Sequence, residues 1–357
     1  MKTAFFQSFE DSSDREETPF RLSMVQAELK KNSLSGYLVP RSDVHQGEYV
    51  AACDERLSWL TGFTGSAGIC VVGKDRAGIF VDGRYSIQAR KQTLSPFEVI
   101  QWDKKNFFHW IEKNIVKGKI GFDPWLHSHK EIFSLSEEFA NSGISFAPSD
   151  NLIEKVWMTR PAKTSNKIMK YPDDLAGLSA REKCQKIAEN IRVKKANSAV
   201  ITLPDSIAWL LNLRGNDVIH NPILHAFLII DSEGCVKIFS RNDSLLHCIS
   251  DLNDFVEVYP VENFETTLSE LTGSVIMDET TAPFAAVKIL QANGSEPIMG
   301  EDPIILPKAC KNPVELRHAR ICHKRDAVHM CEFLSWLDKQ NENEFDEIDV
   351  VIELENF

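Results

Sequence analysis

The chain of 357 residues is long enough for about two domains with a remainder. Hydrophobic residues make up 43% and charged residues 26%, which is typical of a chain that folds around full cores and argues against general disorder. The net charge of -12, with Lys and Arg scattered along the sequence, disfavours nucleic acid as a partner, and no apolar run reaches the ~20 residues that a membrane helix needs.

The first part of the chain alternates between strand and helix patterns. Residues 1–19 are polar and acidic and predict a flexible extension, and residues 20–32 have helical spacing. Short apolar runs predict strands at 36–40, 69–73, 77–82, 97–102, 119–123 and 144–148. Helical patterns lie between them, at 84–94, 104–116 and 129–141. This order favours an α/β domain with a mixed sheet over residues 20–160.

The same alternation returns after a linker. Periodicity is lost and prolines and lysines accumulate over 161–174, which predicts that linker, and a second α/β domain is predicted over 175–311. Its predicted strands cover 199–204, 225–231, 235–240, 255–261 and 275–278. Its predicted helices cover 179–195, 262–271 and 283–293. Pro297, Pro303 and Pro307 predict an irregular exit from this domain.

Two similar blocks mark matching places in the two domains. The sequence ERLSWLTGFTGSAG occupies residues 55–68, and DSIAWLLNLRGNDVIHNP occupies residues 205–222. Each has a Trp-Leu pair, then a glycine-bearing loop, then a strand-like run, with Trp59 and Trp209 in step. We interpret the domains as two copies of one unit and the two tryptophans as core anchors.

A third element begins at Asn312. Asn312, Pro313 and Glu315 have the pattern of an N-cap, a first-turn proline and a capping glutamate, so a helix is predicted to about Lys339. One face of this helix is an apolar stripe that needs a large partner surface, formed by Leu316, Ala319, Ala327, Cys331, Leu334 and Leu337. Little sequence follows to supply that surface, because the last thirteen residues predict only the first turns of another helix. We therefore expect residues 312–357 to be the start of a truncated domain.

The cysteines and the N-terminus favour a cytoplasmic protein. None of the eight cysteines forms a CxxC pair and most lie in apolar stretches, so we expect them to be reduced and buried. The N-terminus has no apolar core of the signal-peptide kind.

Five motifs in this order resemble cytosolic aminopeptidase P, the three-domain Xaa-Pro aminopeptidase of the creatinase and prolidase superfamily. They are SDVHQGEYVAACDERLSWLTGFTGSAG (42–68), FVDGRYSIQA (80–89), IEKVWMTRP (153–161), DSIAWLLNLRGNDVIHNP (205–222) and KNPVELRHARICHKRDAVHMCEFLSWL (311–337). The resemblance implies two tandem creatinase N-terminal-like domains, which are ribonuclease H-like mixed sheets flanked by helices. A pita-bread catalytic domain would follow, and residues 312–357 would be its first helices.

The resemblance also implies a chemistry. Two divalent metals, usually manganese, activate a water that attacks the bond before proline in peptides with proline at the second position. The family's ligands (two aspartates, a histidine and two glutamates) correspond to positions past Phe357, so no catalytic residue and no metal ligand is expected in this chain, and the 357 residues alone are expected to be inactive. The histidines agree, since they contain no HExxH and no pair four residues apart.

One residue of the family's site does correspond to a position in this chain. Arg84, in the DGRY motif, matches the arginine by which the family's first domain contacts bound peptide. The other interpretation is a surface arginine that caps the start of a helix or pairs with Asp82. The loop of Phe63, Thr64, Gly65 and Ser66 matches a loop that such homodimers place near the partner's active site, and the other interpretation is a tight turn before a strand.

A stand-alone dimerisation or peptide-binding module without hydrolase activity is the main alternative, and an apolar face of the helix at 312–339 left uncovered would argue against it. A duplicated-domain ATPase needs glycine-rich phosphate loops in both halves, which are missing. A prolidase or creatine hydrolase parent is disfavoured by the doubled N-terminal unit.

Overall fold

The computed structural model describes residues 4–9, 12–163, 166–341 and 345–357. Parts of the predicted extension (1–3, 10–11) and linker (164–165) lie outside the described residues. The described chain divides into two units. The larger comprises residues 13–171 and 178–309, and the smaller comprises residues 1–12, 172–177 and 310–357. None of the described helices has the length and apolar character to cross a membrane.

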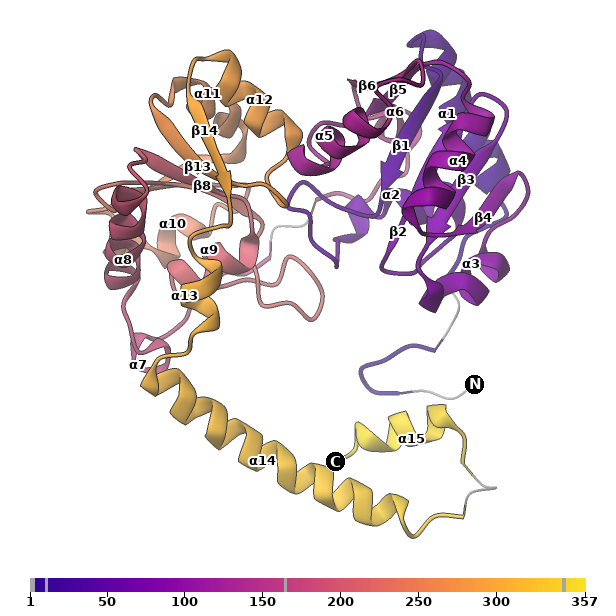
Figure 1. Ribbon diagram of the computed structural model, residues 1–357. Helices are drawn as coiled ribbons and strands as arrows, with labels where there is room; N and C mark the ends of the chain where they lie inside the picture. The colour runs from indigo at the N-terminus through magenta and orange to yellow at the C-terminus, as the bar shows by residue number, and fades with distance from the viewer. Residues whose placement is uncertain (1–3, 10–11, 164–165, 342–344) are drawn as a thin grey trace. The chain divides into compact units, whose positions relative to one another are not determined.

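The larger unit contains two lobes of the same design (Figure 1). The N lobe, from α1 to α6, has a six-stranded sheet in the order β4-β3-β2-β1-β5-β6. Its strands are β1 Gly36–Pro40, β2 Gly68–Gly73, β3 Ala77–Val81, β4 Phe97–Gln101, β5 Gly118–Phe122 and β6 Ile144–Pro148. Its helices are α1 Thr18–Lys31, α2 Arg56–Thr61, α3 Ser86–Gln92, α4 Lys104–Asn114, α5 His129–Glu138 and α6 Leu152–Val156.

The M lobe, from α8 to α13, repeats this order as β12-β11-β10-β8-β13-β14. Its strands are β8 Ser198–Ile201, β10 Ala226–Asp231, β11 Val236–Ser240, β12 Val256–Pro260, β13 Ser274–Asp278 and β14 Glu296–Gly300. Its helices are α8 Ala180–Val193, α9 Pro204–Leu210, α10 Leu245–Cys248, α11 Phe264–Glu270, α12 Phe284–Ala292 and α13 Ile305–Ala309. A short pair, β7 Met169–Lys170 with β9 Leu213–Arg214, lies outside both sheets.

Both sheets are mixed, as the sequence predicts. In the N lobe β1–β2 and β2–β3 are antiparallel, whereas β1–β5, β5–β6 and β3–β4 are parallel. Every residue of β1 is buried, because helices cover both faces of the sheet. One apolar layer packs under α1 and includes Leu22 and Leu29, and the other packs under α4 and α5 and includes Phe107 and Ile132.

The duplicated Trp blocks fold alike. Trp59 lies near the end of α2 and Trp209 near the end of α9, and each helix is followed by a left-handed residue, Gly62 (φ 80°) or Asn212 (φ 51°). Both tryptophans are half-buried and pack at the edge of their lobe's core. The alignment of the two blocks is therefore confirmed, and the tryptophans border the cores without being enclosed by them.

Two expectations about local structure are wrong. The segment around Pro297 is not an irregular exit but strand β14, which is tolerated because β14 is the edge strand and pairs only with β13. Among the cysteines, which are all free, Cys53, Cys70 and Cys184 are buried as expected. The exposed ones are Cys235, Cys310, Cys322 and Cys331. Cys235 follows a turn, and Cys322 and Cys331 lie on a helix that is mostly exposed.

The two lobes are joined through matching turns. Ser128 and Pro283, each immediately before its helix (α5 or α12), form an isolated β-bridge with each other. Phe284 N donates to His127 O at 2.9 Å, and His129 N donates to Ala282 O at 3.1 Å. Because equivalent turns of the two copies bond to each other, the lobes meet as a pseudo-symmetric pair.

The smaller unit contains α7 Asp173–Ala176, the 25-residue helix α14 Pro313–Leu337 and α15 Glu347–Leu354. The predicted cap is present, since the Asn312 side chain accepts from Val314 N and Glu315 N and also donates to Ala176 O. Phe333 is the one residue of α14 that is buried. Most of the predicted apolar stripe is therefore exposed, including Leu316 and Leu334.

Candidate functional site

Arg84 lies in a single helical turn, Gly83–Tyr85, between β3 and α3. Asp82 caps this turn by accepting from Arg84 N at 2.8 Å. The same carboxylate accepts from Arg84 Nε at 3.0 Å and from one terminal nitrogen at 2.5 Å, and this hydrogen bonding lowers the pKa of Asp82. The Arg84 side chain remains 67% exposed. The pairing with Asp82 thus orients a guanidinium that still faces solvent.

The loop of Phe63 to Ser66 is held from inside the N lobe. Phe63 is fully buried, so it anchors the loop and does not face a substrate. A Cβ on Gly65 would lie 2.2 Å from the Phe63 ring and 3.0 Å from the Tyr85 ring, so this position has no room for a side chain. Thr64 N donates to the Gln92 side chain at 3.0 Å. Ser66, which is half-exposed, presents the hydroxyl that this loop offers to its surroundings.

Tyr85 connects the loop to Arg84. Its hydroxyl lies 2.8 Å from Ser66 Oγ, its ring packs edge-on against Phe63 at 5.6 Å, and the Arg84 guanidinium carbon lies 5.1 Å from the ring centroid. The structure therefore brings Arg84 and the loop together, as one surface that we call the Arg84 surface (Ser66, Asp82, Arg84 and Tyr85). Sequence reasoning missed Tyr85, although it follows Arg84 directly in the DGRY motif.

Arg41 fixes the loop from its other side. Its Nε donates to Gly65 O at 3.3 Å, and its terminal NH2 group pairs with Glu55 at 3.0 Å. The side chain is 7% exposed. Burial raises the pKa of Glu55 and Arg41 opposes that increase. Arg41 is therefore a positioning residue for the loop, and no sequence pattern distinguished it from other arginines.

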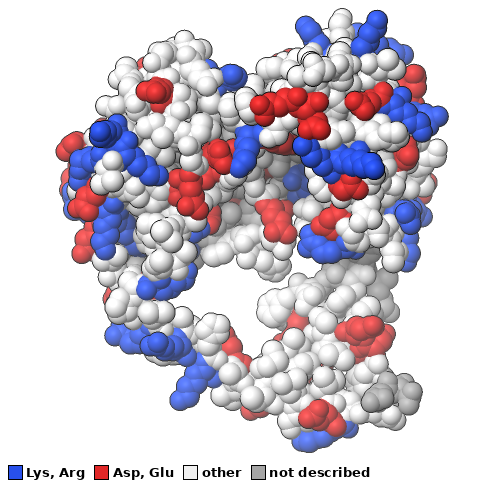
Figure 2. Space-filling view, viewed as in Figure 1, with Lys and Arg blue, Asp and Glu red and all other residues white. Residues whose placement is uncertain are grey.

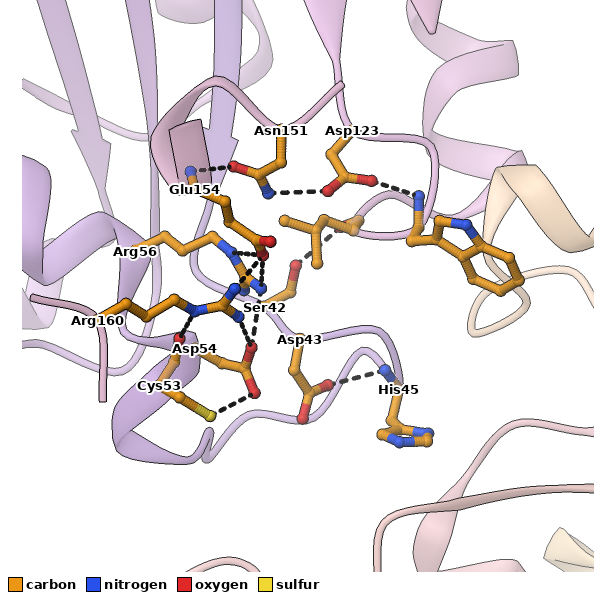
Figure 3. A network of polar contacts seen from close by, with 12 residues as sticks. Ser42, Asp43, His45, Cys53, Asp54, Arg56, Asp123, Asn151, Glu154 and Arg160 are labelled. Carbon is orange, nitrogen blue, oxygen red and sulfur yellow. Dashed lines mark hydrogen bonds and ion pairs between the residues drawn. The ribbon is translucent and has the colours of Figure 1, made fainter. Parts of the chain in front are cut away.

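A partly buried ion network joins two of the motifs that carry the family resemblance (Figure 3). Arg56 pairs with Asp54 at 2.8 Å and with Glu154 at 2.6 Å. Arg160 bonds to the same two carboxylates, at 3.1 and 2.7 Å, and to Cys53 O at 2.7 Å. Burial raises the pKa of Asp54, but the cations around it, Arg56 first, bring it below its usual value. The network fixes the segment that precedes α2, so these charges are structural.

The acidic and histidine side chains do not form a metal centre in the part of the chain that the structure describes. Among those residues no group of three or more His, Cys, Asp and Glu side chains is arranged to hold a metal ion. On the face drawn in Figure 2, Lys and Arg alternate with Asp and Glu over the larger unit and do not gather into a basic patch.

Comparison with known proteins agrees with the duplicated fold. Two models described as the creatinase/prolidase N-terminal domain match residues 21–158 and 159–315. A probable Xaa-Pro aminopeptidase P of Coccidioides posadasii is 34% identical over 340 residues, which are 91% of this chain and 52% of that protein. Its counterpart in Talaromyces stipitatus is 32% identical over 95% of this chain and 54% of its own length. The chain therefore spans about half the length of the curated relatives it matches.

One solved structure matches both lobes. The X-prolyl aminopeptidase of Caenorhabditis elegans, described as a cytosolic enzyme with a di-nuclear active site, superposes with a TM-score of 0.84. The match covers 94% of this chain and 59% of that one, at 24% sequence identity. At this identity the likeness shows the fold.

Proposed function

The chain belongs to the aminopeptidase P family, and on that premise we propose that it forms the non-catalytic part of a metal-dependent Xaa-Pro aminopeptidase, which removes an N-terminal residue that precedes proline. The observation that carries the proposal is the match of 91% of this chain to 52% of a probable Xaa-Pro aminopeptidase P. In this role the two lobes support dimerisation and substrate access.

The proposed chemistry needs a centre that the described residues do not fit. Two divalent metals, which we propose to be manganese, would activate water and polarise the carbonyl before proline. The described residues offer no cluster of three or more metal-binding side chains. We therefore propose that the described residues do not bind the two metals and that the 357-residue chain does not hydrolyse peptides by itself.

Arg84 is proposed to bind the peptide substrate. Asp82 accepts from Nε and one terminal nitrogen of Arg84. Among the contacts of the described residues, the other terminal nitrogen has no protein acceptor, so its two N–H groups are available to a peptide carbonyl or carboxylate. The Tyr85 ring lies beside this guanidinium, and the Tyr85 hydroxyl contacts Ser66 in the loop. By analogy with the family, the surface would reach an active site shared with a second subunit of a homodimer.

The exposed face of α14 supports the catalytic-parent proposal over the alternative of a stand-alone dimerisation or peptide-binding module. Leu316 and Leu334, which lie on the same face, are 42% and 49% exposed. A helix with such a face needs a covering surface, which a following catalytic domain would supply. The alternative would gain support if copies of the chain itself covered this face in solution.

We further propose a cytoplasmic location and no nucleic-acid or membrane partner. The matched C. elegans enzyme is described as cytosolic, all eight cysteines of this chain are free, and positive charge is dispersed.

The substrate role of Arg84 is tested by steady-state kinetics on an Xaa-Pro-Xaa peptide with manganese, using a product extended past Phe357 through the catalytic half. Arg84→Ala should lower kcat/KM at least tenfold, since it removes a charge-assisted contact of about 1.5–3 kcal/mol. Arg90→Ala, at another exposed arginine of the same segment, is the matched control and should leave kcat/KM unchanged. Equal kinetics for the two variants would remove Arg84 from the proposal.

A further inference from the structure

A cavity of about 520 Å³ lies between the N lobe and the M lobe, and none of the functions above uses it. Residues of the N lobe and of the M lobe both line it, so a molecule in the cavity would touch both copies of the duplicated unit. The lining residues on which the argument depends are Asp43, His45, Trp125, His225, Phe227 and Phe264.

Asp43 brings a buried carboxylate to this cavity. The residue is 2% exposed. Its Oδ1 accepts from His45 N at 2.9 Å (Figure 3). It also accepts from Gly47 N at 3.2 Å, and the two contacts fix the side chain. Its Oδ2 lies 3.5 Å from His225 Nε2, which carries a positive charge only when protonated. Among the described residues no lysine or arginine pairs with Asp43, so a cation in the cavity would offset the cost of burying this charge.

His45 brings a hydrogen-bond acceptor to the same place. Its ring is buried and its Nδ1 lies 3.0 Å from Thr202 O. A carbonyl oxygen only accepts, so Nδ1 carries the proton and Nε2 keeps a free lone pair. Burial lowers the pKa of His45 to about 4, so the ring stays neutral at physiological pH. Within the described part of the chain Nε2 has no hydrogen-bond partner, and it can accept from a ligand.

Aromatic rings form the rest of the wall. Phe227 and Phe264 stack at 4.3 Å, Trp125 lies 6.1 and 6.2 Å from these two rings, and the His45 ring packs on Phe227 at 4.6 Å. Because Phe227 stacks on Phe264 and carries the His45 ring, these rings contribute apolar edges, and the half-buried Trp125 ring completes a wall that can bury an alkyl group.

The other charges around the cavity are mostly paired within the protein. Asp54 is held by Arg56 and Arg160, and Arg241 is held by Glu262 at 2.6 Å. Asp217 accepts from the backbone N–H groups of Asn166 and His225, and Glu265 and Lys163 also line the cavity. Asp43 and Asp217 are thus the buried lining carboxylates without a side-chain cation among the described residues. Both oxygens of Asp217 accept from backbone N–H groups, whereas Asp43 Oδ2 has only the more distant His225 ring as a partner.

We propose that this cavity binds a small primary ammonium compound with an apolar body. The ammonium group donates to Asp43 Oδ2 and His45 Nε2, and the apolar body packs against Trp125, Phe227 and Phe264. Because the ligand contacts both lobes, binding would stabilise their association and raise the thermal stability of the chain with the logarithm of ligand concentration above Kd. The inference does not depend on the proposed peptidase role.

The test compares two probes of the same shape. Isobutylammonium chloride and isobutanol are titrated into the 357-residue chain, while NMR follows the imidazole signals of His45 and His225. We expect saturable shifts of both signals with isobutylammonium and binding at least about tenfold weaker for isobutanol. Equal responses to the two probes, or no saturable shift with isobutylammonium, would overturn the proposal.

Matched variants locate the charge that is responsible. Asp43→Asn keeps an acceptor for the backbone N–H groups and should weaken isobutylammonium binding at least about tenfold. Asp231→Asn is the control, because Asp231 also accepts from two backbone N–H groups of its own turn but does not line the cavity. If Asp43→Asn does not fold, Ala51→Phe, at a half-buried lining residue, should fill the cavity and abolish the shifts. Unchanged binding in the variant that folds would contradict the assignment.

Discussion

The hydroxyl groups of Tyr85 and Ser66 lie 2.8 Å apart, and this contact joins the turn that carries Arg84 to the loop of Phe63 to Ser66. The two segments are also neighbours in space because β2 and β3, which adjoin them in the chain, are paired strands. The contact makes the geometry of the Arg84 surface depend on a hydrogen bond between two side chains that are both half-exposed.

Removing this contact should loosen the surface. Tyr85→Phe keeps the ring that packs on Phe63 but removes the hydroxyl, so the free energy of unfolding should fall by about 1 kcal/mol. Tyr49→Phe, at a tyrosine that is 58% exposed, is the control and should change it by less than about 0.5 kcal/mol. Urea denaturation of both variants measures the difference, and the same unfolding midpoint for the two would show that the contact contributes nothing.

Gly65 should not tolerate a methyl group. In Gly65→Ala the new Cβ would lie 2.2 Å from the buried Phe63 ring, so the loop or the ring must move and the free energy of unfolding should fall by about 1–3 kcal/mol. Gly300→Ala is the matched control, since no atom lies within 4 Å of a Cβ there. In thermal unfolding, the Tm of Gly65→Ala should be clearly lower than the Tm of Gly300→Ala. A Gly65→Ala protein as stable as Gly300→Ala would mean that the loop is free to shift.

His45 should make the chain sensitive to acid. Burial lowers its folded-state pKa to about 4, whereas the unfolded chain binds the proton with the ordinary pKa of 6.5. The unfolded state therefore binds more protons between these values, and stability falls as pH drops from 6.5 to 4, by about 3 kcal/mol from this group. Asp43 opposes this shift of the pKa and His225 adds to it.

The prediction is checked by urea denaturation across that pH range. His45→Gln should reduce the loss of stability between pH 6.5 and pH 4. Its free energy of unfolding at pH 6.5 should itself be lower than that of the wild type. His247→Gln, at an exposed histidine, is the control and should keep the wild-type slope. Parallel stability curves for wild type and His45→Gln would show that another group is responsible for the acid sensitivity.

Much of the fold follows from local patterns in the sequence. The strand β1 is a continuous apolar run because helices cover both faces of its sheet, and the Asn312 cap is readable because its three side chains act within one turn. Strand β14 could not be predicted in the same way, since whether Pro297 is tolerated depends on its position at the sheet edge.

Only part of the geometry of the candidate site follows from the sequence, and the substrate role of its residues stays a prediction. Arg84 and the loop were identified through a family resemblance, but the burial of Phe63 and the linking role of Tyr85 depend on tertiary packing. The cavity between the lobes could not be predicted from sequence, because His45 and His225 are far apart in the chain and meet only through the pairing of matching turns. No local pattern records such a contact.

The central claim is that these lobes serve a catalytic centre built from other residues. The most direct measurement is the hydrolysis of an Xaa-Pro-Xaa peptide, with manganese, by the purified 357-residue chain alongside a product that continues past Phe357 into the catalytic half. The account predicts cleavage of the bond before proline by the longer product alone. Manganese-dependent cleavage by the 357-residue chain itself would contradict it.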